Sequence, residues 1–189
     1  YLLAWDQEIV QGVLGYIPTA RYDSALKDRN VVWLALWKVR DACTTPMLGL
    51  RLLQALGSFE PNIGIAVNGI NATHPPMYEA LGYVVHDLIQ YILVNPEMPN
   101  RILRCPEGTE FPVPTDGGAV IRETGAEALR HMKLEGHAFC IQKSPQYFIS
   151  RFLNHPFYQY RVFTIEVAHK AAALIATRKT TLGESSMLR

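Results

Sequence analysis

The sequence predicts a mixed α/β fold of the α+β kind, in which a mixed, mostly antiparallel sheet is flanked by helices. The nearly continuous apolar run Val31–Val39 is typical of a strand buried on both faces. Leu2–Trp5 and Ile9–Ile17 are rich in apolar and β-branched residues and flank a polar Asp-Gln-Glu turn, which predicts a hairpin. Thr-Thr-Pro at 44–46 and Pro-Pro at 75–76 open two helical patterns, because threonine caps and early prolines favour helix starts.

The remaining elements of the first half follow in order along the chain. Leucines at helical spacing predict a helix over 45–57 that ends in glycine. Asn62–Val67 has the composition of a short buried strand, and residues 77–81 that of a short helix closed by Gly82. Tyr83–Val94 is predicted to be a further strand. The resulting order of three strands, helix, strand, helix and strand indicates a mixed sheet.

Proline and glycine are concentrated between the two halves of the chain, which favours a domain boundary there. We expect a first domain over 1–95, a connector over 96–134 and a further segment over 135–189. A hairpin expected at Tyr160–Thr177 is similar in length to the one at Leu2–Ile17, which is a faint internal echo. Because the chain starts within a strand and without an initiator methionine, we expect it to be a fragment.

Composition and charge narrow the classes of function. Lysine and arginine number 18 against 17 aspartates and glutamates, so no basic excess points to nucleic acid or to an anionic membrane surface. The longest apolar runs, such as Val31–Trp37, are far too short to cross a bilayer, and no secretory signal pattern is present, so we expect a cytoplasmic protein. Cys43, Cys105 and Cys140 have neither disulfide-framework nor metal-ligand spacing, so we expect no metal site.

The segment that leads from the buried strand into the first helix suits an anionic ligand. Unpaired N–H groups at the first turn of that helix point outward, and the helix dipole adds partial positive charge there. Gly49 lets the backbone approach a ligand closely. Such a strand–loop–helix suits a pyrophosphate, although many α/β proteins contain one without that function.

A second pattern lies in the next helix. Asn71, Tyr78 and the pair Gly82-Tyr83 have the spacing Asn-x6-Tyr-x3-Gly-aromatic. Together with the strand, loop, helix and strand before it, this spacing resembles the acyl-CoA core of the GNAT superfamily of N-acetyltransferases. The resemblance covers roughly residues 1–94 in the order of elements. It implies a GNAT-like acyl-CoA N-acyltransferase fold, in a chain whose N-terminal helices we expect to be missing.

The resemblance implies that the chain binds acetyl-CoA, or another acyl-CoA, as a co-substrate. Asn71 would contact the cofactor at the mouth of two splayed strands. Tyr78 would lie beside the thioester sulfur and protonate the departing thiolate. Backbone groups would hold the rest of the cofactor, with the pantetheine arm at Leu36, Trp37 and Val39, and the pyrophosphate at Met47, Leu48, Gly49 and Leu50.

The implied activity is that of an enzyme that transfers an acetyl or other acyl group from acyl-CoA to a small-molecule amine, such as an amino sugar or a sugar nucleotide. The general base is unassigned, and the candidates are Asp23, Asp41, His74, His86 and Asp87. The loop departs from the family pattern, because Met47 replaces its first glycine and Thr44 stands where a basic residue or glutamine is usual. This departure favours the alternative, a non-catalytic GNAT-like module that binds a ligand or a partner. Whether the protein forms a homodimer is left open.

The second half of the chain has a resemblance of its own. Lys143–Tyr158 and the hairpin after it look like the start of another acetyltransferase-like repeat. Tandem proteins of this kind occur among bacterial acyltransferases of polysaccharide and sugar modification. The resemblance implies that 135–189 is the start of a second GNAT-like repeat, or a C-terminal subdomain, whose CoA core is absent from this chain.

Overall fold

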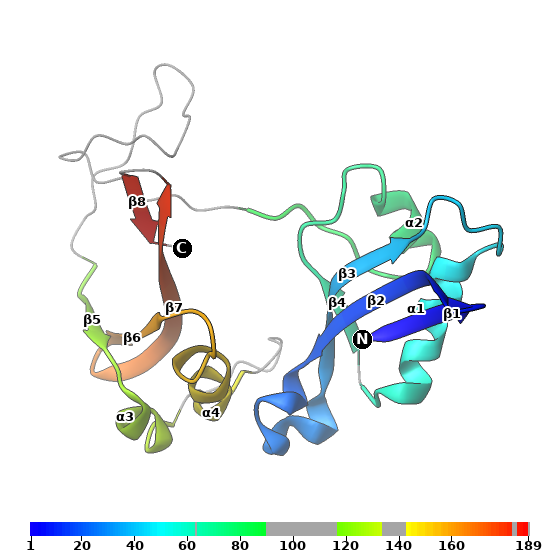
Figure 1. Cartoon of the computed structure of the whole chain (residues 1–189). Helices are drawn as coiled ribbons and strands as arrows, with labels where there is room; N and C mark the ends of the chain where they lie inside the picture. Colours follow the sequence, from blue (N-terminus) through cyan, green and yellow to red (C-terminus); the bar gives the residue numbers. More distant parts are fainter. Residues whose placement is uncertain (63, 90–116, 134–142, 183–184, 189) are drawn as a thin grey trace. The chain divides into compact units, whose positions relative to one another are not determined.

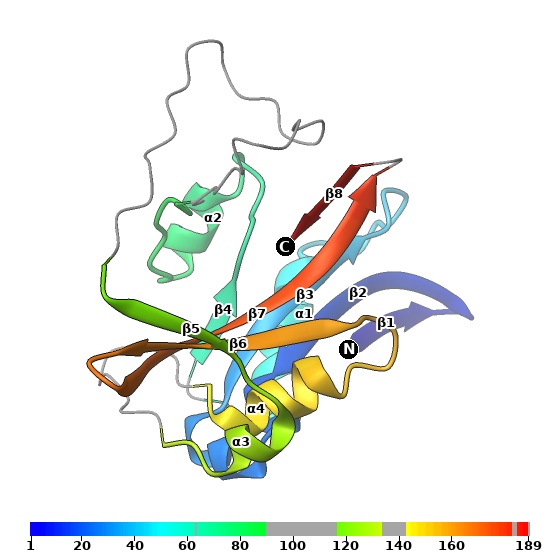
Figure 2. The same cartoon turned by 90° about the vertical axis from the view of Figure 1, so that its left-hand side faces the viewer.

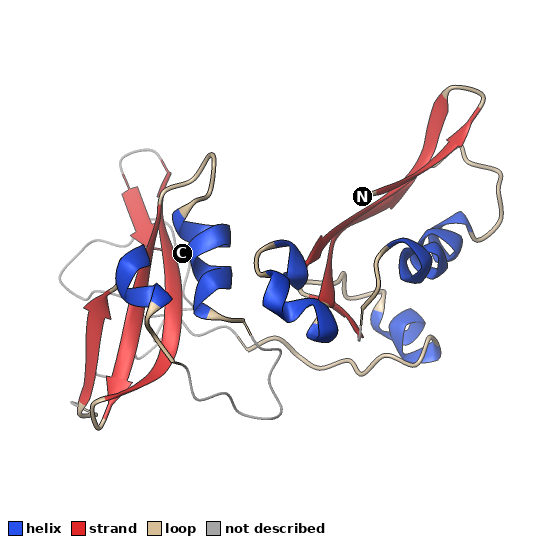
Figure 3. Cartoon of the chain, turned by 90° about the horizontal axis from the view of Figure 1, so that it is seen from below, coloured by secondary structure: helices blue, strands red, loops and turns tan. Residues whose placement is uncertain are grey.

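The computed structural model describes residues 1–62, 64–89, 117–133, 143–182 and 185–188, and of 182 and 185–188 it describes the backbone alone. Cys105, Cys140 and most of the connector expected from the sequence lie outside these residues. The chain divides into two compact units, Tyr1–Ile89 and Gln90–Arg189, each with a sheet of its own (Figures 1 and 3). None of the described helices is long and apolar enough to span a bilayer.

The first unit is built on four strands, β1 (Leu2–Asp6), β2 (Ile9–Pro18), β3 (Val31–Val39) and β4 (Gly64–Val67). They lie in the order β1-β2-β3-β4. β1 and β2 form the expected hairpin, β3 pairs antiparallel with β2, and β4 pairs parallel with β3. The sheet is therefore mixed, and the expected mixed α/β class is confirmed.

One helix, α1 (Leu48–Phe59), packs against one face of this sheet. Its leucines recur at helical spacing and therefore share one face, which meets alternate residues of the strands. The cluster buries Leu52, Leu53 and Leu56 of the helix together with Leu14, Val32 and Leu34 of the sheet. α1 begins three residues later than the threonine-proline signal predicts, because Met47 adopts a left-handed backbone conformation just before it. This delayed start brings the first turn of the helix next to β3.

The loop between β2 and β3 holds two short 3-10 helices, η1 (Thr19–Arg21) and η2 (Ser24–Arg29). The buried Asn30 ties this loop to the end of α1. Its Oδ1 accepts from the Thr19 hydroxyl at 3.3 Å and from the Ala20 N–H at 3.1 Å, and its Nδ2 donates to the Pro61 carbonyl at 2.8 Å. The polar groups of this buried amide are thus paired at the end of the sheet where β3 begins.

The second unit is built on an antiparallel sheet of order β5-β6-β7-β8. Figure 2 shows its short helices beside the sheet. Leu129, Ile149 and Val162 form the centre of its core, which joins these helices to β6. The elements are β5 (Ala119–Glu123), α3 (Ala126–Arg130), α4 (Pro145–Phe148), η3 (Ile149–Leu153), β6 (Tyr160–Val167), β7 (Lys170–Leu182) and β8 (Ser185–Leu188).

The hairpins β1–β2 and β6–β7 have the same type of turn and the same register around it. Each turns through two residues with positive φ, Gln7 (45°) and Glu8 (72°) in the first, and Ala168 (49°) and His169 (63°) in the second. Positive φ at both central residues is the mark of the type I′ turn, whose twist matches that of the strands. In each hairpin the third residue after the turn is left out of the pairing as a bulge. The faint sequence similarity between these hairpins is thus accompanied by the same strand register.

Besides the bounds of α1, which runs through Gly57 to Phe59, two expectations differ from the structure. The strand predicted at Tyr83–Val94 is not formed over Tyr83–Ile89, and the rest of that range lies outside the described residues. Its apolar side chains Val84, Leu88 and Ile89 are exposed, and no described strand pairs with the segment. The range 96–134, expected as a connector, contains β5 and α3, and β5 pairs with β6 of the second unit.

Candidate functional site

β3 and β4 diverge about halfway along β3. β4 pairs only with Val31–Leu34, whereas β3 continues to Val39. At the same point Ala35 is left out of the pairing with β2, because Leu34 faces Tyr16 and Leu36 faces Gly15. A bulge of this kind bends a strand and increases its twist. The bulge therefore lies next to Leu34, the last residue of β3 that pairs with β4.

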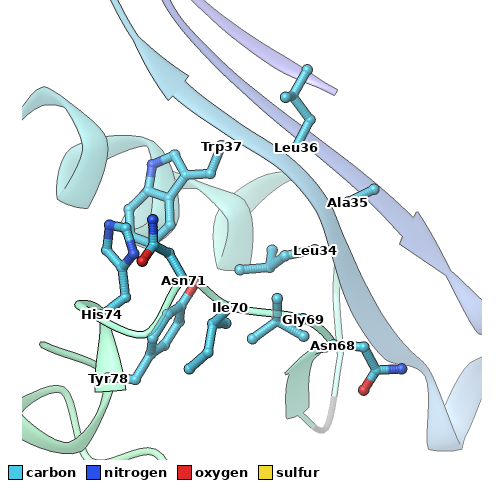
Figure 4. Close-up of a pocket in the computed structure, with 11 residues that line it drawn as sticks. Leu34, Ala35, Leu36, Trp37, Asn68, Gly69, Ile70, Asn71, His74 and Tyr78 are labelled. Carbon is cyan, nitrogen blue, oxygen red and sulfur yellow. The ribbon is translucent and has the colours of Figure 1, made fainter. Parts of the chain in front are cut away.

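A pocket of about 210 Å³ lies where the two strands diverge (Figure 4). Its walls come from the β3 segment 34–37, from the end of β4 and the turn after it (67–71), and from His74 and Tyr78 at the next helix. That helix is α2 (Pro75–Ala80), and His74 is the residue just before it. The side chains of Asn71, His74 and Tyr78 all reach from this side toward β3 (Figure 4).

The free edge of β3 offers backbone groups next to this pocket. The Arg40 N–H donates to the Gln11 carbonyl at 2.8 Å, which fixes the direction of alternation along the strand. Backbone groups alternate between the two sides of a strand. The N–H and C=O groups of Leu36 therefore face β2, as the Arg40 N–H does, and those of Trp37 and Val39 face the open edge. Of the three positions predicted to hold a pantetheine arm, Trp37 and Val39 present their backbone there, and Leu36 contributes to the pocket wall.

The start of α1 is the second predicted anchoring point. Met47 precedes it with φ 55° and ψ 25°, and the residue is 67% exposed. The N–H groups of Met47 to Leu50 are the first four of the helix and have no acceptor within it. The first turn carries no acidic side chain and no side-chain cap. The four predicted pyrophosphate contacts are therefore grouped on one helix end, with the dipole favouring an anion.

The structure gives a reason for glycine at position 49 that the sequence did not reveal. A Cβ atom at this position would lie 3.1 Å from Nε1 of Trp37. The absence of a side chain therefore lets α1 lie directly against the Trp37 indole. Gly49 thus connects the predicted anion site at α1 to the ring that forms one wall of the pocket.

Tyr78 is held by two other aromatic rings. It is only 6% exposed, and its ring meets those of Trp37 and Tyr83 edge to face, at centroid distances of 6.1 and 5.6 Å. Burial raises the pKa of the Tyr78 phenol above its usual value, and the nearby Tyr83 adds to the shift. Its hydroxyl makes no hydrogen bond with another described residue and points into the pocket (Figure 4). The phenol is therefore a protonated donor in a position to meet a ligand.

The spacing from Tyr78 to Gly82-Tyr83 is that of a helix end. The Tyr83 N–H donates to the Tyr78 carbonyl at 3.0 Å, and the Gly82 N–H donates to the Glu79 carbonyl at 2.9 Å. This pair of bonds is the Schellman motif, which requires the left-handed conformation that Gly82 adopts with φ 83°. The contact between the two tyrosine rings completes the motif. The most specific part of the sequence pattern therefore also has a purely structural cause, independent of any ligand.

Asn71 shapes the turn that leads into α2. Its Oδ1 accepts from the Thr73 N–H at 3.2 Å and from the Thr73 hydroxyl at 3.3 Å, and the His74 N–H donates to its backbone carbonyl at 2.9 Å. The amide oxygen is therefore used within the turn. The Nδ2 donor group makes no hydrogen bond with a described residue and is the part of Asn71 that can bind a ligand.

The structure distinguishes the five candidates for a general base by their partners and their positions. Asp41 pairs with Lys38 at 2.6 Å, and this hydrogen bond and charge lower the pKa of its carboxyl. Asp23 caps η2 by accepting the Ala25 N–H at 2.9 Å. His86 and Asp87 are exposed and do not line the pocket. His74 alone of the five lies in the pocket wall, in a place that the sequence did not distinguish from the others.

Two further features complete the description of the site. Ile70 and Leu34 supply apolar surface to the pocket, and nothing in the sequence marks Ile70 for this place. Within the described part of the chain, no group of three or more histidine, cysteine, aspartate or glutamate side chains is arranged to hold a metal ion.

Comparison of the chain with protein-family models, with curated proteins and with solved structures found no match.

Proposed function

We propose that the first unit has a GNAT-like fold, binds an acyl-CoA and transfers its acyl group to an amine. The observation that carries the proposal is the divergence of β3 from β4 at Leu34, with Tyr78 in the pocket that the divergence leaves. An extended ligand arm can add to a free strand edge as an extra strand would. The pocket beside that edge supplies a proton donor where the reactive end of such an arm would lie.

The size of the pocket supports the same assignment. The volume of about 210 Å³ is below the range of pockets that enclose a whole drug-sized ligand, so it suits the thioester end alone. The remainder of the cofactor would lie along Trp37 and Val39 and reach the N-terminus of α1 with its pyrophosphate. Gly49, packed on Trp37, sets the distance between these two anchoring points.

The proposed chemistry assigns Tyr78 a single step. The amine nitrogen attacks the thioester carbonyl, the C–N bond forms, and the C–S bond breaks. The Tyr78 hydroxyl gives its proton to the departing sulfur, which a buried neutral phenol is suited to do. No covalent intermediate with the protein is required. An amino sugar or a sugar nucleotide remains our proposal for the class of acceptor.

Titration calorimetry with acetyl-CoA and with desulfo-CoA tests the binding step. We expect both to bind, and no heat of binding at high micromolar concentration would reject the proposal. Thiol release then tests the chemistry. Tyr78→Phe should lower kcat by about 100-fold while acetyl-CoA affinity is retained, because only the proton is removed. Tyr83→Phe is the matched control, since it deletes a hydroxyl from the neighbouring ring and should keep turnover.

A second candidate function is a non-catalytic module that binds a ligand or a partner. The observation that favours it is Met47, whose exposed side chain and left-handed backbone stand at the helix end proposed for the pyrophosphate. A Cβ at this place leaves less room for a phosphate than glycine would. Binding of acetyl-CoA without thiol release in the presence of amines would support this function over the enzyme.

For the second unit we propose the start of a repeat of the same fold. Its hairpin has the turn and register of β1–β2, so that Val162 and Thr164 correspond to Tyr1 and Leu3. Val162 is 1% exposed and Thr164 is 2% exposed, because α3, α4 and η3 cover that face. Tyr1 is 79% exposed and Leu3 is 37% exposed on the corresponding face of the first unit. The second unit thus has a helical layer that the described first unit lacks.

A fusion tests this correspondence. A copy of residues 117–161 placed directly before Tyr1 keeps the register of β6 in β1, because residue 161 corresponds to the position before Tyr1. We expect the fusion to raise the urea midpoint of the first unit, since it buries apolar surface on Leu3 and its neighbours. The same fusion with Leu129→Asp, which disrupts the added layer, should show no gain. Equal midpoints for the two fusions would reject the correspondence.

A further inference from the structure

The pocket at the divergence of β3 and β4 contains two ionisable side chains among its lining residues, His74 and Tyr78. They stand one helical turn apart, and the Tyr78 N–H donates to the His74 carbonyl at 3.2 Å. Residues at this spacing share one face of a helix turn. Both rings therefore reach the same small space from α2 and the residue just before it, as Figure 4 shows.

Acyl transfer to an amine needs a proton acceptor as well as a donor. When the nitrogen attacks the thioester carbonyl, it must lose one proton, while the departing sulfur gains one. Tyr78 can give a proton to the sulfur but cannot accept one from the nitrogen, because a buried neutral phenol holds its own proton. A complete site therefore requires a base within reach of the same carbonyl.

We propose that His74 accepts the proton of the attacking amine while Tyr78 donates to the sulfur, an assignment that rests on the acyltransferase function proposed above. The C–N bond forms as the C–S bond breaks, one N–H proton passes to the imidazole, and the phenol proton passes to the thiolate. Transfer of a proton from the imidazolium to the phenolate, through water, restores both groups. The net products are an amide and free CoA, so the step is balanced in atoms and charge.

The state of the His74 imidazole fits this role. Its ring makes no hydrogen bond or ion pair with another described residue, so neither nitrogen is committed to a structural contact. It is exposed, which leaves it accessible to an acceptor that arrives from solvent. The other candidates are engaged or remote, since Asp41 pairs with Lys38 and Asp23 caps η2. Histidine is also the side chain that most often accepts or donates a proton in general acid–base catalysis.

The test uses the full chain with acetyl-CoA and three probe amines, glucosamine, ethanolamine and lysine, and follows thiol release. We expect His74→Ala to lower kcat by about 100-fold and to leave acetyl-CoA affinity unchanged by calorimetry. Added imidazole should restore part of the lost rate, which a purely structural role would not explain. His86→Ala is the matched control, because it removes an exposed histidine of the same unit outside the pocket. Folding of each variant is checked by circular dichroism, and the His74 side chain caps no helix.

The outcomes separate this proposal from the one on which it rests. A wild-type chain that binds no acetyl-CoA, or that transfers to none of the three amines, rejects the acyltransferase function and with it the role of His74. Wild-type turnover that His74→Ala leaves at the level of His86→Ala rejects the role of His74 alone. Loss of rate in His74→Ala that imidazole does not restore, while His74→Gln retains the wild-type rate, also rejects it, because an amide keeps the hydrogen bonds but accepts no proton.

Discussion

The phenol ring of Tyr78 meets the indole of Trp37 edge to face, with 6.1 Å between the ring centroids. This contact joins α2 to the part of β3 that β4 does not pair with. An edge-to-face pair of this kind contributes about 1 kcal/mol beyond the burial of its surface. The same contact therefore stabilises the position of α2 and places the proposed proton donor beside the proposed binding edge.

The burial of Tyr78 predicts a loss of stability at high pH. Burial, with a smaller effect of Tyr83, raises the pKa of the Tyr78 phenol in the folded chain above its unfolded value of about 10. The stability due to the neutral phenol is thus full below pH ~10 and is lost as pH rises through the folded pKa. Tyr78→Phe removes this group, so the stability difference between wild type and variant should change in favour of the variant above pH ~10.

Urea unfolding at pH 8 and at several values above pH ~10 measures this difference. All three tryptophans, Trp5, Trp33 and Trp37, lie in the first unit, so their fluorescence reports on that unit. A stability difference that stays constant across this pH range would contradict the assignment of a raised pKa to Tyr78.

The helix end at Gly82 predicts opposite effects for the same substitution at two glycines. Gly82→Ala should destabilise the first unit by about 1 kcal/mol, because φ of 83° is unfavourable for a residue with a Cβ. Gly57→Ala should stabilise it by about 0.5–1 kcal/mol, because Gly57 lies within α1 and a Cβ there meets no atom within 4 Å. Tryptophan fluorescence in urea gives both values. The same sign for the two variants would show that backbone conformation does not set the effect.

Much of the fold follows from local signals in the sequence. The hairpin at β1–β2, the apolar strand β3 and the leucine face of α1 are each encoded within a short segment, and each forms as predicted. Tyr83–Ile89 has a similar strand-like composition but has no partner strand among the described residues, so its propensity alone does not produce a strand. Pairing across the sheet, rather than composition, decides such cases.

The site was predictable only in part. The Asn71–Tyr78 spacing led to two residues that do line one pocket. The bulge at Ala35 and the left-handed conformation of Met47 carry no compositional signal, because neither residue is a glycine. The choice of His74 among five candidate bases required the partners of the others, such as the Lys38–Asp41 ion pair, which sequence alone does not give.

Met47 predicts a gain from a glycine substitution. A residue with a Cβ at φ 55° costs about 1–2 kcal/mol, of which glycine's greater freedom in the unfolded chain offsets part. Met47→Gly should therefore stabilise the first unit by about 0.5–1 kcal/mol in urea. Under the proposed function it should also tighten acetyl-CoA binding, because the backbone at the start of α1 becomes more accessible. Met47→Ala keeps the Cβ and should do neither, and equal stability of the two variants would show that the backbone at 47 is not strained.

The two matched hairpin turns predict stabilisation by the residues that type I′ turns prefer. Gln7→Asn with Glu8→Gly should raise the stability of the first unit by about 1 kcal/mol, because asparagine and glycine tolerate positive φ at both positions. The gain appears as a higher urea midpoint of tryptophan fluorescence. Ala168→Asn with His169→Gly makes the same change in a unit without tryptophan. It should raise the midpoint of the second unit's far-ultraviolet dichroism and leave the tryptophan transition in place. An equal shift of the tryptophan transition by both double variants would mean that the units unfold as one, because a turn in the second unit can influence that signal only through coupled unfolding.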